Sequence, residues 1–518
     1  MANCCHRPQA SSRKQLSEPI IVVSEGVTAN PQYAMASPVS LSIREGEQVA
    51  IVGANASGKT RLVEILTGHY RLRGDAIRFC FSYIPEGRSS NVIRYISFCD
   101  AYGEIDNNYF LQLRWNQTEI SEETPTARQF LNKVGTTEGS STSDDNRRKE
   151  VYRLFGLEPL LDRYIVNLSS GELRKCQLAR VLLSCPRVLI IDNPFIGLDT
   201  TACDILVDAM RRIIAQERIT LILVLPRATQ IPSFITHVIP VNRGHVLPIV
   251  SREEFLPHDI PCPQPVLSSD ERLRILSLPE KDLSQTPFYP QRGGEILQFN
   301  NVSIRYGGRA ILENINWTVC EGERWALTGA NGSGKSTLLS LVCADNPQGY
   351  ACDIRLFGHR RGTGESIWEI KRHIGYVSPE LHRAYRKNIP AIDLVASGFH
   401  DTVGLYTRST DNEKERCLFW MEIFGIRHLA TRPYLQLSSG EQRLCLLVRA
   451  FVKDPELLIL DEPLHGLDEY YHQRVREIIT AFCERRHKTL IMVTHHLEEL
   501  PPCITHHMKL KLKYPIAL

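Results

Sequence analysis

Two stretches of sequence, GANASGKT at Gly53–Thr60 and GANGSGKS at Gly329–Ser336, decide the fold. Each matches the pattern GxxxxGK[ST], follows a short apolar run and precedes a segment with helical periodicity. In such a loop, glycines let backbone N–H groups converge on phosphate oxygens, and the N-terminus of the next helix adds a favourable dipole. The sequence therefore predicts a phosphate-binding strand–loop–helix unit that occurs twice.

The motifs that follow each loop also occur twice and in the same order. LSSGE at Leu168–Glu172 recurs at Leu437–Glu441, VLIIDNP at Val188–Pro194 recurs as LLILDEP at Leu457–Pro463, and IGLD at Ile196–Asp199 recurs as HGLD at His465–Asp468. These later pairs are all 269 residues apart, whereas Lys59 and Lys335 are 276 apart. An internal duplication explains this order. The extra residues of the first copy are expected in the polar stretch Gly135–Lys149, as a solvated surface loop.

The duplication divides the chain into copy one (residues 18–250), a linker (251–293) and copy two (294–512). Several prolines in the linker favour an irregular segment with one short helix. Within each copy, short apolar runs alternate with helical segments. We expect an α/β fold: two tandem P-loop NTPase domains, each built on a mostly parallel sheet flanked by helices.

Composition narrows the function classes. The 518 residues include 61 Lys+Arg and 58 Asp+Glu, so the formal charge of +3 gives no sign of a nucleic-acid or membrane footprint. No apolar run approaches the 18 residues of a membrane-spanning helix, and the polar N-terminus lacks the apolar core of a signal peptide. The 15 cysteines form no CxxC pair, which favours free thiols in a reducing compartment. We expect a cytoplasmic protein.

The loops predict specific contacts to a nucleoside triphosphate and Mg²⁺. Lys59 and Lys335 would reach the β- and γ-phosphates, and Thr60 and Ser336 would bind Mg²⁺. An apolar strand ending in Asp is the companion element, so Asp192 and Asp461 would also hold the metal, directly or through water.

The residue after each of these aspartates differs between the copies. In copy two it is Glu462, a carboxylate that can orient or deprotonate an attacking water. In copy one it is Asn193, which cannot accept a proton. The sequence thus predicts one catalytic and one degenerate copy.

Together the glycine loop, LSSGE, the DE box and VTHH at Val493–His496 resemble the ATP-binding cassette superfamily over both halves of the chain. The resemblance implies that two cassettes, each with a helical subdomain, pair head to tail. Each ATP then lies between the glycine loop of one and the LSSGE signature of the other. The implied ATP-binding residues are Gly53, Ala54, Asn55, Ala56, Ser57, Gly58, Lys59 and Thr60, then Gly329, Ala330, Asn331, Gly332, Ser333, Gly334, Lys335, Ser336 and Thr337, with Tyr306 and the signature residues Ser169, Ser170, Gly171, Ser438, Ser439 and Gly440.

The resemblance also makes the two sites unequal. Site A would join the copy-two loop, with Asp461, Glu462 and the switch histidine His495, to the copy-one signature. Site B would join the copy-one loop to the copy-two signature, and its switch position falls on Pro226. We expect Glu462, His495 and Lys335 to be catalytic at site A, and site B mainly to hold nucleotide.

Some positions depart from the family pattern. No glutamine follows the strands RYIS or IGYVS where the family has one; Glu380 could bind the metal through water in copy two, and Gln112 or Gln117 could serve in copy one. Tyr306 aligns with the aromatic residue that stacks on adenine, although ordinary packing explains it equally well. Copy one has Asn30 at that place, with Tyr33 as a weak substitute.

Two function classes fit these motifs. The first is the ATPase subunit of a transporter that drives a separate integral-membrane permease; the tandem arrangement resembles the ModF-like branch, nominally linked to molybdate transport. The second is a ribosome-binding translation factor of the ABC-F kind, although that class joins its cassettes by a long charged helix rather than a proline-rich linker. A regulatory ATPase is the third alternative. His496 and the pair His506–His507 could suggest a metal site, but neighbouring surface histidines are more often unliganded.

Overall fold

Strands buried on both faces form the centre of each half of the chain. In copy one, every residue of β3 (Val49–Val52), β6 (Val188–Asp192) and β7 (Thr220–Leu225) is buried. Such continuous apolar strands need helices on both faces of the sheet. The computed structural model describes residues 18–81, 92–97, 125–132, 142–165, 168, 170–217, 219–256, 267–279, 294–306 and 309–511.

The central sheet of copy one has the strand order β10-β8-β3-β7-β6-β5, with β9 paired to β8. The five strands from β8 to β5 are parallel, while β10 and β9 pair antiparallel to β8. The remaining strands of this sheet are β5 (Ile93–Ser97), β8 (His237–Asn242), β9 (His245–Val246) and β10 (Val250–Ser251).

The central sheet of copy two repeats this order as β16-β17-β18-β13-β19, and all its pairs are parallel. Its strands are β13 (Arg324–Thr328), β16 (Ile374–Val377), β17 (Leu457–Asp461), β18 (Thr489–Val493) and β19 (His506–Lys509). In copy one the glycine-loop strand β3 lies between β7 and β8, and in copy two β13 lies between β18 and β19. This shared strand order confirms the predicted tandem α/β fold.

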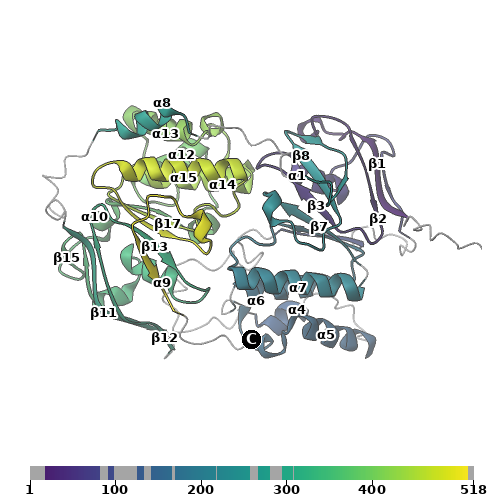
Figure 1. Ribbon diagram of the computed structural model, residues 1–518, viewed down its shortest axis with the longest axis horizontal. Coiled ribbons are helices and arrows are strands. Elements are labelled where there is room, and N and C mark those ends of the chain that lie inside the picture. The colour runs from purple at the N-terminus through teal and green to yellow at the C-terminus, as the bar shows by residue number, and fades with distance from the viewer. Residues whose placement is uncertain are drawn as a thin grey trace, which may run out of the picture.

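Helices cover these sheets (Figure 1). The helix that follows the glycine loop and the helix that begins at the signature exchange places between the two halves of the molecule. The helix after the copy-two glycine loop, α9, lies on the side facing α6, and α14 lies on the side facing α1. The helices of copy one are α1 (Lys59–Leu66), α4 (Ala127–Asn132), α5 (Thr142–Phe155), α6 (Ser170–Leu182) and α7 (Thr200–Glu217). Those of copy two are α9 (Lys335–Val342), α10 (Ile367–Lys371), α11 (Pro379–Ala384), α12 (Ala391–Ala396), α13 (Asp411–Ile423), α14 (Ser439–Phe451) and α15 (Glu469–Glu484).

Each copy also has a small antiparallel sheet that the sequence analysis did not predict. In copy one it is β2-β1-β4, and in copy two β12-β11-β14-β15. The bounds are β1 (Pro19–Gly26), β2 (Val39–Arg44), β4 (Ile77–Phe79), β11 (Glu295–Tyr306), β12 (Arg309–Cys320), β14 (Asp353–Leu356) and β15 (His359–Arg360). In β2, buried and more exposed residues alternate, as expected for a strand with one face on the core.

Two connecting segments differ from a plain loop. The polar stretch expected as a surface loop is helical over its second part, because α5 begins at Thr142; residues 133–141 lie outside the described part. In the linker, the single described helix α8 (Ser269–Leu276) begins with a capping box between Ser268 and Glu271. It is docked on copy two: Ile275 is fully buried in that core, and the Glu271 carboxylate pairs with Arg474 at 2.5 Å. Within the residues described, no helix is both long and apolar enough to cross a membrane.

Candidate functional site

The two glycine loops lie at the carboxyl ends of β3 and β13 and turn directly into α1 and α9. Gly58 and Gly334 have φ of 105° and 96°, a left-handed conformation that residues with a Cβ rarely adopt. The Lys59 amine donates to the carbonyls of Gly53 (2.8 Å) and Ala54 (2.7 Å). Lys335 makes the same two bonds in copy two, so both loops have one geometry.

Both loops fit the phosphates of ATP. A Cβ on Gly53 would lie 2.2 Å from the Val241 carbonyl, so the loop approaches its neighbour closely only because it lacks a side chain there. The hydroxyls of Ser57 and Ser333 are buried without a hydrogen-bond partner, so each can donate to an anion. Burial lowers the pKa of Lys59 to about 8, and a phosphate beside it would favour the charged form.

A buried carboxylate ends β6 in copy one and β17 in copy two, one strand away from the glycine-loop strand in each sheet. Burial raises the pKa of Asp461 to about 8, with further repulsion from Glu462 and Glu380. Burial likewise raises the pKa of Asp192, whose Oδ2 accepts a hydrogen bond from the Tyr95 hydroxyl at 3.1 Å. A divalent cation would compensate this crowded negative charge, so the donor set fits Mg²⁺.

Two histidines lie against the Glu462 carboxylate, and His465 hydrogen-bonds to it. The Glu462 Oε1 lies 2.9 Å from Nε2 of His495, and its Oε2 lies 3.0 Å from Nδ1 of His465. Burial raises the pKa of Glu462, but the hydrogen bond from His465 and the nearby imidazole of His495 outweigh burial and hold the pKa well below the usual range. The carboxylate therefore stays charged and able to accept a hydrogen bond from water.

The backbone is strained at this position in both copies. Glu462 has φ of 49° and Asn193 has φ of 51°. Asparagine tolerates the left-handed region, whereas glutamate is uncommon there. Their N–H groups donate to the carbonyls of Val493 (2.9 Å) and Val224 (3.0 Å), which fix the turn. A strained glutamate retained in only one copy points to a functional role there.

The glycine loops contact the opposite copy. The Asn55 N–H donates to Oδ2 of Asp468 at 2.8 Å, and the Asn331 N–H donates to Oδ2 of Asp199 at 3.0 Å. A Cβ on Gly440 would lie 2.1 Å from Nδ2 of Asn55, so the copy-two signature touches the copy-one loop. The two copies therefore meet head to tail.

The signature residues begin the helices that face the opposite loops. Ser438 caps α14 in a capping box with Glu441, and Ser439 and Gly440 form its first turn. In copy one, Ser170 and Gly171 begin α6, and Ser169 lies outside the described residues. At site B the structure thus shows Asn55 of the copy-one loop against Gly440 of the copy-two signature. At site A it shows the contact of copy one through Asp199.

An arginine in each signature helix holds the strand-end loop of its own copy. Arg174 donates to the carbonyl of Ile196, and Arg443 donates to the carbonyl of Glu462. The sequence analysis did not single out these residues, although both stand five residues after the first signature serine and repeat at the common spacing of 269. Each arginine links the signature helix to the turn after the Asp-ending strand of its own copy.

A further contact between the copies lies beside the switch positions. Arg227, next to Pro226, forms an ion pair at 3.6 Å with Glu499 in η11 (Leu497–Glu499). The Glu499 side chain is 6% exposed and also accepts a hydrogen bond from Thr494 at 3.0 Å. Burial raises its pKa, but the hydrogen bond from His472 and nearby histidine charges lower it to about 2. Glu499 is thus a buried anion that lies between His472 of its own copy, at 3.4 Å, and Arg227 of the other copy.

Removing this cation should destabilise the chain. We expect Arg227→Met to lower the free energy of unfolding by about 2 kcal/mol, because it takes the guanidinium away from a buried carboxylate that then keeps only histidines as basic neighbours. The control is Arg211→Met, which breaks an exposed pair with Asp208 and should cost less than about 1 kcal/mol. Urea denaturation followed by circular dichroism measures both. Equal midpoints for the two variants would show that the contact between the copies contributes nothing.

The other predicted positions are placed as follows. The Tyr306 hydroxyl accepts a hydrogen bond from Nδ2 of Asn346 at 2.8 Å, and the ring packs on the core, so adenine stacking stays a prediction. Tyr33 stacks on Tyr70, with 4.4 Å between ring centroids. Gln112 and Gln117 lie outside the described residues.

His506 stacks on Trp325 in β13, and no group of three His, Cys, Asp or Glu side chains suited to a metal was found in the described part of the chain.

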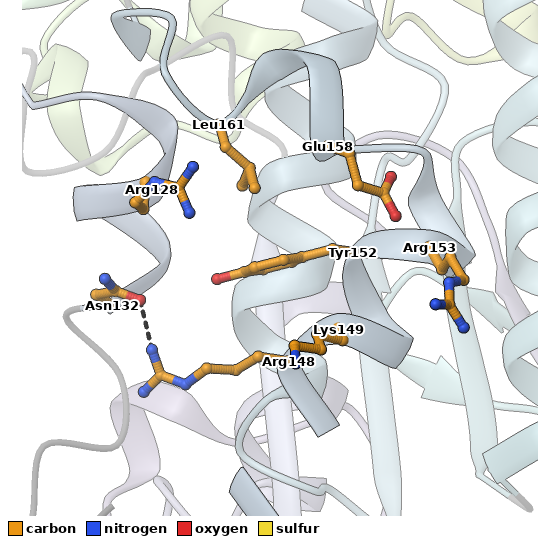
Figure 2. Close-up of a pocket in the computed structure, with 8 residues that line it drawn as sticks. All are labelled: Arg128, Asn132, Arg148, Lys149, Tyr152, Arg153, Glu158 and Leu161. Carbon is orange, nitrogen blue, oxygen red and sulfur yellow. Dashed lines mark hydrogen bonds between the residues drawn. The ribbon is translucent and has the colours of Figure 1, made fainter. Parts of the chain in front are cut away.

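A basic hollow of about 470 Å³ lies in the helical part of copy one (Figure 2). Its lining residues are Arg128, Asn132, Arg148, Lys149, Tyr152, Arg153, Glu158 and Leu161. Arg148 donates to the Asn132 side chain across the opening, and Arg128 pairs with Asp162 at 3.0 Å. No predicted nucleotide-site residue lines this hollow, so it stands apart from the ATP chemistry.

Comparison with known proteins agrees with this geometry. A family model described as "ABC transporter" matches residues 36–196 and 312–465, once in each copy. The chain belongs to the ABC transporter family. It is 36% identical over 470 residues to the ABC transporter ATP-binding protein ModF of Escherichia coli (strain K12), covering 90% of this chain and 92% of ModF. An uncharacterized ABC transporter ATP-binding protein of Schizosaccharomyces pombe (strain 972 / ATCC 24843), C323.04, is 28% identical over 485 residues, covering 91% of this chain and 94% of that protein.

Two solved structures share the fold along most of the chain. The archaeal ribosome recycling factor aABCE1, solved with ribosomal stalk protein aP1, matches with a TM-score of 0.51 and 18% identity, covering 94% of this chain and 87% of that chain. A structure titled RNase-L Inhibitor gives a TM-score of 0.50 at 18% identity, covering 95% and 88%. At this identity the likeness concerns the fold alone. This chain is therefore an ABC ATP-binding protein with two cassettes.

Proposed function

We propose that the chain is a Mg²⁺-dependent ATPase that binds ATP at two sites between its copies and hydrolyses it at site A. One observation supports this asymmetry most. Glu462 is charged, hydrogen-bonded to His465 and 2.9 Å from His495, whereas the same position in copy one is Asn193, with Pro226 at the switch position. Site B retains Lys59 and Asp192 and so can bind nucleotide without a carboxylate to act on water.

At site A, each residue has a distinct task. Mg²⁺, held by Ser336 and Asp461, would supply positive charge at the β- and γ-phosphates. Lys335 would bind the γ-phosphate, and the loop N–H groups would stabilise charge on the transferring phosphoryl group. Glu462 would orient the attacking water, and His495 would keep the carboxylate in place. Asp199 holds the copy-two loop from the other copy, so hydrolysis would require both copies in contact.

We further propose that this ATPase drives a separate integral-membrane permease. The family supports this role, and so does an anchored, exposed segment of copy two between η8 (Ser397–Phe399) and α13. There Tyr406 is 74% and Val403 37% exposed, while the Gly404 N–H donates to the buried Tyr385 hydroxyl at 3.1 Å. A fixed loop that exposes large apolar side chains is suited to a protein partner. The expected link to molybdate stays a prediction.

Affinity isolation with the Glu462→Gln variant in ATP tests this role. The variant should hold the closed form, so an integral-membrane protein should be recovered with it from detergent-solubilised membranes. The double variant Glu462→Gln/Tyr406→Ser should recover much less, while Glu462→Gln/Leu273→Ser, altered at another exposed apolar residue on α8, should recover as much as the single variant. Recovery with ribosomes instead would contradict the permease and support the translation-factor alternative.

A further inference from the structure

The basic hollow in the helical part of copy one takes no part in the ATP chemistry (Figure 2). Its volume is about 470 Å³, within the range of cavities that hold small organic ligands. The lining side chains come from α4, from α5 and from residues 158–161. Four of these side chains are basic and one, Glu158, is acidic, so the hollow attracts anions.

The hollow has an apolar base and a charged rim. Tyr152 and Leu161 belong to the buried core of copy one, whereas the basic lining residues are partly or fully exposed. In Figure 2 the Tyr152 ring lies between Arg128 on one side and Arg153 on the other. A ligand whose carbon body lies on this ring would therefore meet cations from two helices, α4 and α5.

Two of the cations are left without a counterion. Arg128 pairs with Asp162 at 3.0 Å, but Lys149 and Arg153 form no ion pair with any residue that the structure describes. They stand four residues apart on α5, where two like charges repel each other and destabilise the helix slightly. An anion bound between them would replace this repulsion by charge-assisted hydrogen bonds.

The same place in copy two shows that the fold does not require these charges. The Phe-Gly pairs at the ends of α5 and α13 are 269 residues apart, so positions on the two helices correspond. Leu418 takes the place of Lys149. Glu422 takes the place of Arg153, and its carboxylate accepts a hydrogen bond from Arg274 of the linker helix α8 at 2.8 Å. In copy two this position thus holds a group of opposite charge.

We propose that the hollow of copy one is a binding site for a small organic polyanion. The phosphate or carboxylate groups of the ligand pair with Lys149 and Arg153 on one side and with Arg128 on the other, and its carbon body lies on Tyr152. Guanidinium groups suit both kinds of anion because their paired N–H groups match two oxygens at once. The site does not depend on hydrolysis at site A.

Isothermal titration calorimetry with two probes tests this site. Fructose 1,6-bisphosphate carries two phosphates and citrate carries three carboxylates, so the tighter of the two shows which group the hollow prefers. We expect at least one probe to bind at one site per chain. In Lys149→Gln/Arg153→Gln, which removes the two cations without a counterion, its Kd should rise about 10- to 100-fold.

The matched control removes two cations elsewhere in copy one. Arg211→Gln/Arg212→Gln changes two exposed residues of α7 and lowers the net charge by the same amount, and it should change the Kd less than about twofold. Equal weakening in the two double variants would mean that the probe responds to overall charge alone, and it would overturn the proposal, as would the absence of saturable binding by either probe.

Melting temperatures give a second readout and check the folding of the variants. Without a probe, Lys149→Gln/Arg153→Gln should melt at the same temperature as the unmodified chain or slightly above it, because it loses a repulsive pair. The bound probe should raise the melting temperature of the unmodified chain and of the α7 variant. The same rise in Lys149→Gln/Arg153→Gln would contradict the assigned site.

Discussion

Replacing Glu462 by glutamine is expected to reduce ATP turnover by about 1000-fold, within the range contributed by a positioned general base. Glutamine has the same shape and can still bond one histidine, but it carries no charge and cannot accept a proton from water. The loop contacts of Lys335 are untouched, so the Kd for ATP should stay the same or fall. Steady-state phosphate release and equilibrium binding of labelled ATP measure the two quantities.

The matched control is the equivalent position of copy one. Asn193→Ala removes the side chain at the same strained turn, where φ is 51°, and both variants are checked for folding by their melting temperatures. We expect Asn193→Ala to change turnover less than about threefold, apart from a small loss of stability at the positive φ. Similar losses of turnover in the two variants would contradict the assignment of unequal sites.

The second large effect is expected from Asp199, which lies in the copy with the degenerate motifs. Its Oδ2 accepts the Asn331 N–H from the copy-two loop at 3.0 Å. We expect Asp199→Ala to lower kcat/KM about 10- to 100-fold, since a hydrogen bond to a charged group contributes roughly 1.5–3 kcal/mol. Phosphate release at a series of ATP concentrations gives this ratio.

Asp468→Ala is the pseudo-symmetric control. Both aspartates cap the helix that follows them: Asp199 accepts from the Ala202 N–H and Asp468 from the Tyr471 N–H, each at 2.8 Å. Each variant therefore loses one helix cap, which lowers the free energy of unfolding by about 1 kcal/mol. A difference in turnover between the two variants then does not come from this loss of stability. Asp468 contacts the loop of site B, so its loss should reduce turnover less than the loss of Asp199 does. The reverse order would mean that hydrolysis does not occur at the Lys335 loop.

Much of the fold could be predicted because the decisive residues are local. A glycine loop between an apolar run and a helix fixes the strand–loop–helix unit, and repetition of the later motifs at one spacing predicts a second copy of the same sheet. The antiparallel sheets were missed because strands such as β11 and β12 form their pairs through long-range contacts and bulges that short-range patterns do not specify. The polar stretch at residues 142–149 lacks an obvious apolar stripe in the sequence, and α5 packs Val151 and Phe155 of its C-terminal part on the core.

The sequence predicts the motif residues of the candidate site, but it does not predict which residues of the other copy they contact. Lys335, Asp461 and Glu462 follow from residue type and spacing, whereas His465 is one histidine among 17 in the chain. Only the fold shows that its ring lies between Glu462 and the Gly197 N–H of the other copy. The pairing of Arg227 with Glu499 likewise joins elements distant in sequence, and no local pattern indicates it.

The most direct test of two unequal sites is the composition of the nucleotide bound during turnover. The unmodified chain, mixed with Mg²⁺ and ATP labelled at the α-phosphate, is separated rapidly from free nucleotide and quenched, and bound ATP and ADP are counted per chain. We predict two nucleotides per chain, one remaining as ATP at site B and the other converted to ADP at site A. Conversion of both nucleotides to ADP at the same rate would contradict this account.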